Sequence, residues 1–179
     1  MTSFQTSLSN LHTNYIDSIV LHSPLRSLKG TLEVWSVFES LKEQGKVRFL
    51  GISNCYDLGF FKALYEEAKI KPTFLQNRFY AQTGYDHQLR QFCREKQVHY
   101  QSFWTLTANP HIIESAELTE LAKKYSTGPA QVFYKSLIDE GIVPLIGTTS
   151  KQHMEEDLAM LKVQLSAEDR STVWGKIKQ

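Results

Sequence analysis

Polar side chains follow the apolar runs of this sequence at points where an active site could form. The run Ile19-Val20-Leu21 ends at His22, and the run over residues 47–52 ends at Ser53 and Asn54. In an α/β barrel, the carboxyl ends of parallel strands and the loops after them line one mouth, and the active site lies there. A serine hydroxyl and an asparagine amide can each hydrogen-bond to an amide group. These three residues are therefore candidates for a ligand site.

Each of these candidates also has a purely structural interpretation, which the sequence leaves open. A histidine that ends a strand is often a polar residue bonded to a nearby carbonyl. Ser53 and Asn54 could form a turn and cap the following helix. Phe103 and Trp104, which end a later apolar run, could both be core residues, because aromatic side chains at strand ends are commonly packed.

A second group of candidates precedes a predicted helix near the end of the chain. Gly147, Thr148, Thr149 and Ser150 follow an apolar run and lead into that helix. The exposed N–H groups at the start of a helix favour an anion, such as the phosphate of a cofactor. The alternative is that Thr149 and Ser150 only cap the helix.

Periodicity places these residues on alternating strands and helices. Short apolar runs alternate with amphipathic segments, which is typical of repeated βα units and a mainly parallel sheet. We predict five strands, at 15–21, 47–52, 73–76, 98–104 and 142–146. Two helices are predicted over residues 117–124 and 129–139. Four others are predicted from the apolar residues that they carry: Leu32, Trp35, Phe38 and Leu41; Leu58, Phe61, Leu64 and Ala68; Leu89, Phe92 and Cys93; and, after Ser150, Met154, Leu158 and Leu161.

Local signals set several of the predicted helix boundaries. Asp57 is a natural N-cap, and its helix ends before Pro72. Pro129 suits the first turn of a helix. Gly45 and Gly141 are predicted to end the helices that precede them.

Composition indicates an ordinary globular chain. Of its 179 residues, 41% are hydrophobic and 22% are charged, with a formal net charge of +1. Basic residues are scattered among nearly as many acids, so no nucleic-acid partner is expected. No apolar run reaches the length of a membrane span and no leader is evident, so we predict a cytoplasmic protein with Cys55 and Cys93 reduced. No linker divides the chain, and we predict a single domain over residues 1–179.

The motifs, taken in order, resemble those of the aldo-keto reductase family. They are Asn14-Tyr15-Ile16-Asp17, Leu21-His22-Ser23-Pro24, Gly45-Lys46-Val47-Arg48, Gly51-Ile52-Ser53-Asn54, Gln76-Asn77 and Ile146-Gly147-Thr148-Thr149-Ser150. The resemblance implies an α/β fold, here a partial (β/α)8 TIM barrel of about five βα units with parallel strands. It also implies NAD(P)H-dependent hydride transfer between the nicotinamide cofactor and a small carbonyl or alcohol substrate.

The resemblance also assigns roles to the candidates around the nicotinamide. His22 resembles the histidine that orients the carbonyl oxygen of the substrate. Ser53, Asn54 and Gln76 resemble the residues that bind the nicotinamide carboxamide. Phe103 resembles the aromatic residue, usually a tyrosine, that stacks on the nicotinamide ring, and Trp104 stands where the family often has serine.

Around the adenosine, the resemblance implies contacts from residues 147–150 and from the following turn. Gly147 and His153 match positions where members that prefer NADPH often carry lysine and arginine, and Lys151 could compensate for them. Glu156 and Asp157 resemble the pair that contacts adenine. NADP(H) is favoured over NAD(H), with the preference left open, and no metal site is predicted.

The resemblance extends only to strands four to eight of the barrel. A complete barrel needs roughly 250 residues, and Met1 falls inside what resembles the third helix, with Phe4, Leu8 and Leu11 on its apolar stripe. The family's catalytic aspartate, tyrosine and lysine have no counterpart here. We therefore expect little intrinsic turnover and self-association through exposed barrel edges.

Two alternatives remain open at this stage. One is a catalytically inactive derivative that binds a nucleotide or a partner protein. The other is a shorter open parallel sheet outside this family, although the chain has no Gly-x-Gly-x-x-Gly fingerprint and no phosphate-binding lysine loop.

Overall fold

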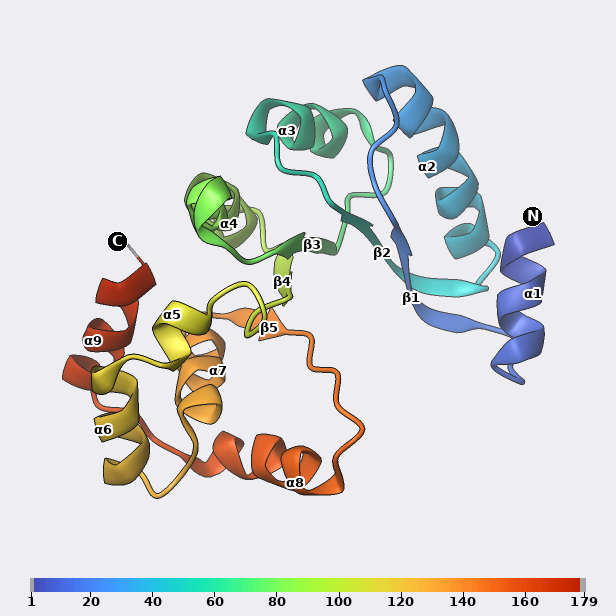
Figure 1. Ribbon diagram of the computed structural model, residues 1–179. Coiled ribbons are helices and arrows are strands. Elements are labelled where there is room, and N and C mark those ends of the chain that lie inside the picture. Colours follow the sequence, from blue (N-terminus) through green and yellow to red (C-terminus); the bar gives the residue numbers. More distant parts are fainter. Residues whose placement is uncertain (1, 178–179) are drawn as a thin grey trace. The chain divides into compact units, whose positions relative to one another are not determined.

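The computed structural model describes residues 2–177, and Met1, which we placed in a helix, lies outside the described residues. Strands and helices alternate along the chain (Figure 1). Their bounds are α1 Thr2–Asn10, β1 Ile16–Leu21, α2 Leu28–Glu43, β2 Val47–Ser53, α3 Leu58–Glu67, β3 Phe74–Arg78, η1 Ala81–Asp86, α4 His87–Glu95, β4 His99–Phe103, α5 Pro110–Ile113, α6 Ala116–Lys124, α7 Pro129–Asp139, β5 Ile142–Pro144, α8 Lys151–Ala159, η2 Met160–Lys162 and α9 Ala167–Ile177.

The chain divides into two compact units, and the boundary between them passes through β3 and β4. The first unit runs up to Asn77 and includes Gln88–His99. The second unit consists of Arg78–His87 and the residues from Tyr100 onward. The predicted single domain over the whole chain stays a prediction.

The first unit is a parallel sheet covered by helices. β1 pairs with β2, and β2 pairs with β3, both in parallel. Helices α2 and α3 lie side by side against these strands (Figure 1). Trp35 is fully buried and donates from Nε1 to the Ile70 carbonyl at 2.9 Å, and Phe61 and Phe92 meet edge to face. These apolar faces form the core that holds the strand ends in place.

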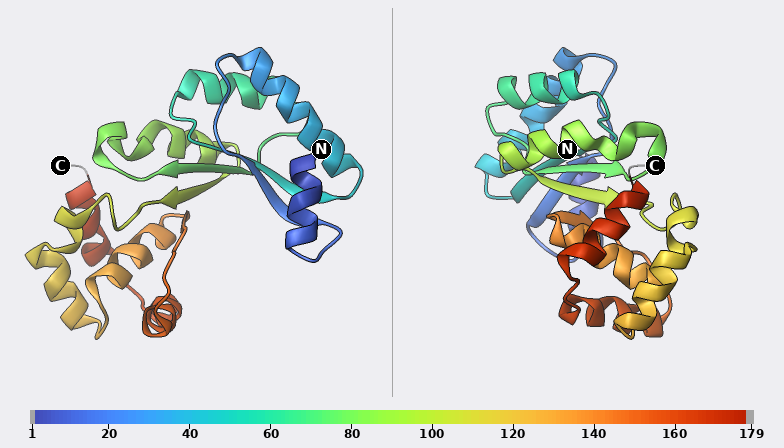
Figure 2. Two further views of the ribbon diagram at one scale, coloured as in Figure 1. Left: turned by 45° about the vertical axis from the view of Figure 1, so that its right-hand side comes forward. Right: turned by 90° about the vertical axis from the view of Figure 1, so that its left-hand side faces the viewer.

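The second unit packs mainly helices around its two strand segments. β4 pairs with β5 in parallel, and α7 packs against β5. Helices α6, α7 and α9 pack against one another (Figure 2). Phe79 lies in the core of this unit between Tyr85 and Phe133.

The five predicted strands are present, and most boundaries agree to within two residues. α2 ends before Gly45 and α7 ends before Gly141, and both glycines adopt positive φ values, as is common just after a helix. Asp57 caps α3, accepting a hydrogen bond from the Phe60 N–H. Local sequence signals were sufficient to predict these helix boundaries, because each signal depends only on residues that are close together in the sequence.

Other expectations were wrong or incomplete. β5 ends at Pro144 rather than at 146, although the Leu145 N–H still donates to the Ser102 carbonyl at 2.8 Å. Leu11 lies beyond the end of α1 and is 62% exposed, so it does not continue the apolar stripe of that helix. We did not predict the short helix α5 or the helix α9. The sequence Ser166-Ala-Glu-Asp169 is a capping box that could have revealed α9.

α8 begins after Ser150 as predicted, but its apolar residues do not enter a core. No residue of this helix, which the structure describes throughout, is buried. Met154 and Leu158 are 46% and 68% exposed, and Leu161, in the following turn, is 57% exposed. Met160 is buried in their place.

Candidate functional site

In the first unit, the carboxyl ends of three neighbouring strands bring four of the predicted site residues together. His22 directly follows β1, Ser53 is the last residue of β2, and Gln76 lies near the end of β3. Ser53 stands opposite Gln76 in the parallel register. The strand order therefore places these polar groups at one edge of the sheet.

Hydrogen bonds join these four residues into one cluster. Ser53 Oγ donates to the Gln76 carbonyl at 2.7 Å and lies 3.4 Å from Gln76 Oε1. Asn54 Nδ2 donates to the His22 carbonyl at 2.9 Å and approaches Ser53 Oγ at 3.3 Å. Ser53 is buried, Asn54 is half-buried and His22 is exposed. The cluster thus has a rigid base and an accessible imidazole.

The backbone of Asn54 turns sharply where the chain leaves β2. Its φ of 52° lies in the left-handed region, which asparagine tolerates better than most residues. The Tyr56 hydroxyl donates to Asn54 Oδ1 at 3.2 Å, so both ends of this amide are held. Ser53 ends β2 and the chain bends at Asn54, but the alternative that these residues cap the next helix is wrong, because Asp57 caps it.

Asn77 is a supporting residue of this cluster to which we assigned no role from the sequence. Its side chain is fully buried, accepts from the Cys55 N–H at 3.0 Å and donates to the Cys55 carbonyl at 2.9 Å. These two bonds fix the loop that follows Ser53 and Asn54. Asn77 lies two positions after Leu75 on the buried face of β3, and a polar residue at such a position was the available signal, since buried polar groups are nearly always hydrogen-bonded.

The loop that begins at His22 is anchored at its far end by Thr31. Thr31 is fully buried, and its Oγ1 accepts from the Leu25 N–H at 3.0 Å and donates to the Ser27 carbonyl at 2.9 Å. Ser27 in turn caps α2 through the Gly30 N–H. These contacts fix the backbone close to the imidazole.

The predicted aromatic position belongs to the second unit. Phe103 is the last residue of β4 and is half-buried, and its carbonyl accepts from the Phe79 N–H at 3.1 Å. Trp104 is 54% exposed, so the alternative that both aromatic residues are core is wrong for Trp104. The Arg78 guanidinium covers the Trp104 ring, with Cζ 4.1 Å from the ring centroid.

The predicted anion-binding segment also lies in the second unit, at the start of α8. Ser150 caps this helix, because its Oγ accepts a hydrogen bond from the His153 N–H at 3.3 Å. This agrees with the alternative interpretation of Ser150 as a helix cap. Thr148 Oγ1 accepts from the Ser150 N–H at 3.1 Å and lies 3.4 Å from His153 Nδ1. Gly147 and Thr149 are exposed. The segment keeps a helix start next to polar side chains, which suits an anion.

The two acidic candidates one turn further along are engaged with neighbouring glutamines. Gln152 Nε2 donates to Glu156 at 2.8 Å. The buried Gln131 donates to Asp157 Oδ1 at 2.8 Å and so ties α8 to α7. Burial, followed by the negative charge of Asp157, raises the pKa of Tyr134 to about 12, so this phenol stays protonated.

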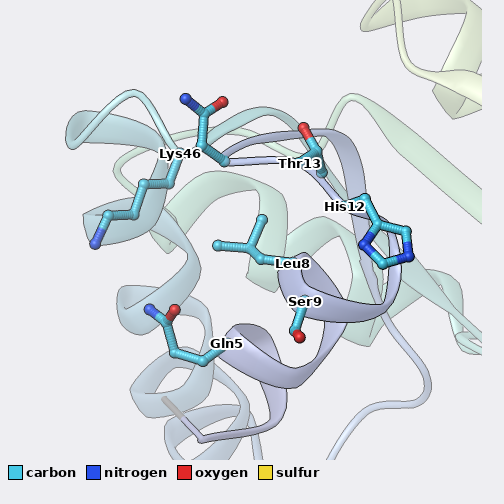
Figure 3. Close-up of a pocket in the computed structure, with 7 residues that line it drawn as sticks. Gln5, Leu8, Ser9, His12, Thr13 and Lys46 are labelled. Carbon is cyan, nitrogen blue, oxygen red and sulfur yellow. The ribbon is translucent and has the colours of Figure 1, made fainter.

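One pocket lies at the amino ends of β1 and β2, away from the cluster at their carboxyl ends. Figure 3 shows its lining, to which α1 contributes three side chains. The lining residues are Gln5, Leu8, Ser9, His12, Thr13, Asn14 and Lys46. None of the predicted site residues belongs to it.

Neither a metal site nor a membrane span is found in the described part of the chain. Residues 2–177 contain no group of three or more histidine, cysteine, aspartate or glutamate side chains that could hold a metal ion. Among the helices that these residues form, none has the length and apolar character needed to cross a bilayer.

Comparison with known proteins identifies a family and a fold. Residues 1–110 match the model of the aldo/keto reductase family. The glyoxal reductase of Bacillus subtilis is 24% identical over 173 residues, which cover 97% of this chain and 61% of that protein. The 9,11-endoperoxide prostaglandin H2 reductase of Trypanosoma cruzi is 28% identical over a region that covers 94% of this chain and 59% of that protein. The chain thus spans about 60% of the length of these curated relatives.

Solved structures confirm the predicted fold class. An aldo/keto reductase from Brucella melitensis superimposes with a TM-score of 0.87 at 24% identity, covering 98% of this chain and 66% of that one. A silkworm (Bombyx mori) aldo-keto reductase in complex with NADPH has a TM-score of 0.82 at 21% identity, and the match covers 98% of this chain and 58% of that one. The five strands and their helices therefore form a partial (β/α)8 barrel, as the resemblance implied.

Proposed function

Because this chain belongs to the aldo/keto reductase family, we propose that it binds a nicotinamide dinucleotide for hydride transfer to or from a small carbonyl or alcohol. The observation that carries this proposal is the hydrogen-bonded cluster of His22, Ser53, Asn54 and Gln76 at the carboxyl ends of β1, β2 and β3. This is the end at which barrels of this class hold their chemistry.

The donors and acceptors of the cluster fit a nicotinamide carboxamide. That group has one carbonyl acceptor and one NH₂ donor, and the Ser53 hydroxyl and the Gln76 amide offer both kinds of partner. Asn54 is held by His22 and Tyr56, yet its Oδ1 retains a second lone pair beside the Tyr56 bond. We assign direct contact to Ser53 and Gln76, and positioning chiefly to Asn54.

His22 then acts on the substrate oxygen. The bound cofactor supplies the hydride, and negative charge develops on the carbonyl oxygen when a carbonyl is reduced. A hydrogen-bond donor aimed at that oxygen stabilises the charge. The exposed imidazole of His22 supplies such a donor, and the hydrogen bond from Asn54 Nδ2 holds its backbone carbonyl. Phe103 offers a ring face for stacking.

For the cofactor we favour NADP(H) over NAD(H). The start of α8 offers N–H groups to a phosphate, with Thr148, Ser150 and His153 around it. Lys151 is available as the nearby cation, since its side chain is 89% exposed and lies 3.7 Å from Glu155. Gly147 contributes no charge, so we expect the preference to be modest.

A titration of the whole chain with NADPH tests this proposal. Removal of the Ser53 hydroxyl in Ser53→Ala takes one hydrogen bond from the carboxamide, and we expect the Kd for NADPH to rise about tenfold. Quenching of tryptophan fluorescence, with the exposed Trp104 as reporter, measures the Kd. Ser36→Ala, which removes an exposed hydroxyl on α2, is the matched control. Equal Kd values for the wild type and Ser53→Ala would refute the assignment.

The same preparation distinguishes an active reductase from an inactive nucleotide-binding derivative. An active enzyme oxidises NADPH in the presence of a small aldehyde at an ordinary rate of about 1 per second or more, and His22→Ala abolishes that rate. Binding that depends on Ser53 but is not followed by oxidation of NADPH identifies the derivative. We expect little turnover from this chain alone.

We also propose that the chain self-associates through an apolar surface of the second unit. Val143, Leu145 and Ile146 are each about 40% exposed, and Leu158 and Leu161 are 68% and 57% exposed. Large apolar side chains left exposed in number are a common feature of interaction sites. Replacing Leu158 and Leu161 by lysine should shift the sedimentation coefficient toward the monomer value. Leu11→Lys, at a 62% exposed leucine of the first unit, should leave it unchanged. An unchanged distribution in the double variant would contradict this.

A further inference from the structure

The Arg78 guanidinium lies against two aromatic rings of the second unit. Its Cζ is 4.1 Å from the centroid of the Trp104 ring and 5.2 Å from that of the Tyr80 ring. Arg78 is the last residue of β3, and Trp104 directly follows β4. The Phe79 N–H donates to the Phe103 carbonyl at 3.1 Å and links these two strand ends. We call Arg78, Tyr80 and Trp104 the arginine clamp.

Buried hydrogen bonds hold the backbone on both sides of the arginine clamp. Asn109 is fully buried, and its Nδ2 donates to the Phe79 carbonyl at 2.7 Å and to the Thr105 carbonyl at 2.9 Å. Thr105 is also buried and donates from Oγ1 to Ser102 Oγ at 3.0 Å. One amide therefore ties the residue after Arg78 to the residue after Trp104.

The conformation of Trp104 is unusual for a structural residue. Its side chain is 54% exposed, and its φ of 56° lies in the left-handed region, which is uncommon for a bulky residue. Such backbone strain persists where the surrounding structure over-determines it, and it concentrates at ligand sites. Here the large ring faces the Arg78 guanidinium instead of a core.

A guanidinium held over aromatic rings is well suited to bind a carboxylate. Its planar fork matches the two oxygens of a carboxylate, and stacking restricts the flexibility of the side chain before binding. Arg78 also lies two residues after Gln76 in the sequence of β3. Gln76 is one of the residues that we assign to the nicotinamide.

We propose that Arg78 binds the carboxylate of the substrate, and that the substrate class is therefore a short oxo acid or hydroxy acid. This inference rests on the proposed function, because it concerns the substrate of that hydride transfer. Trp104 and Tyr80 act as positioning residues that hold the guanidinium in place. The electrically neutral analogues of these acids lack the group that the arginine clamp recognises.

Binding of succinate, a dicarboxylate that cannot react, tests this proposal without requiring turnover. The whole chain is titrated with succinate by calorimetry in the presence of saturating NADPH, and succinamide is the neutral comparison. We expect succinate to bind and succinamide to bind at least about thirtyfold more weakly. Arg78→Met should weaken succinate binding by a similar factor. Arg78→Lys keeps the charge but loses the fork, so it should weaken binding about tenfold.

Controls separate this inference from the proposed function. Arg94→Met removes an exposed arginine of α4 and should leave the affinity for succinate unchanged. A chain that binds NADPH but binds succinate and succinamide equally overturns the arginine clamp alone, as does a wild-type affinity for succinate in Arg78→Lys. Inorganic phosphate that binds more tightly than succinate also overturns the choice of a carboxylate. Failure to bind NADPH instead overturns the proposed function.

Discussion

Replacing Asn77 by leucine is expected to lower the free energy of unfolding by about 4 kcal/mol. Leucine is similar in size to asparagine but cannot bond to the N–H and the carbonyl of Cys55, which Asn77 holds at 3.0 and 2.9 Å. Both backbone groups lie in a buried environment, and each lost buried partner costs roughly 1–3 kcal/mol. The loop after Ser53 and Asn54 would lose its anchor.

Urea unfolding followed by circular dichroism measures this loss. Asn10→Leu, at an exposed asparagine that ends α1, is the matched control and should change the unfolding free energy by less than about 0.5 kcal/mol. At temperatures where Asn77→Leu remains folded, we expect weaker NADPH binding as well, because Asn77 positions the residues that contact the carboxamide. A variant as stable as the wild type would show that the Asn77–Cys55 bonds contribute little.

Removing the carboxylate of Asp169 is expected to cost about 3 kcal/mol at neutral pH. Asp169 is buried at the start of α9 and accepts from Lys124 Nζ at 2.8 Å, from the Tyr125 hydroxyl and from Ser166 Oγ at 2.7 Å. The hydrogen bond from Lys124, followed by those from Tyr125 and Ser166, lowers the pKa of Asp169 to about 2. In Asp169→Asn the shape is kept, but the charge that strengthens these bonds is lost.

The lowered pKa also sets the pH range over which this contribution disappears. The ordinary pKa of an aspartate is 3.8, so the folded state holds the ionised form more strongly than the unfolded state does. The stabilisation is therefore complete above about pH 4 and is lost as the pH falls toward about 2. The difference in unfolding free energy between the wild type and Asp169→Asn should be clearly smaller at about pH 3 than at about pH 7. Glu168→Gln, which changes the exposed neighbouring acid, is the control and should keep the wild-type pH dependence. If the unfolding free energies of the wild type and Asp169→Asn differ by the same amount at both pH values, the assignment is contradicted.

Local patterns were sufficient to predict most of the fold. The five strands, the cap of α3 at Asp57 and the ends of α2 and α7 at Gly45 and Gly141 were all read from periodicity and capping. These features depend on residues within a few positions of one another, so the sequence alone contains them. The order of the motifs further indicated the family to which the chain belongs.

The candidate site was predicted in part, because strand ends can be read locally and contacts between strands cannot. His22, Ser53 and Gln76 were identifiable as polar residues at or near the ends of apolar runs. That Asn54 bonds to the His22 carbonyl is decided by the parallel pairing of β1 and β2. The role of Asn77 likewise depends on a partner 22 positions away in the chain.

The sequence by itself determined which residue types follow each strand and hence the kind of chemistry available to this protein. Tertiary structure alone decided that Trp104 lies outside the core, that Arg78 stacks on it, and that Leu158 stays exposed on α8. The physical reason is that burial and side-chain contact depend on which distant segments pack together. A local pattern records only the preference of each segment, and tertiary packing routinely overrides that preference.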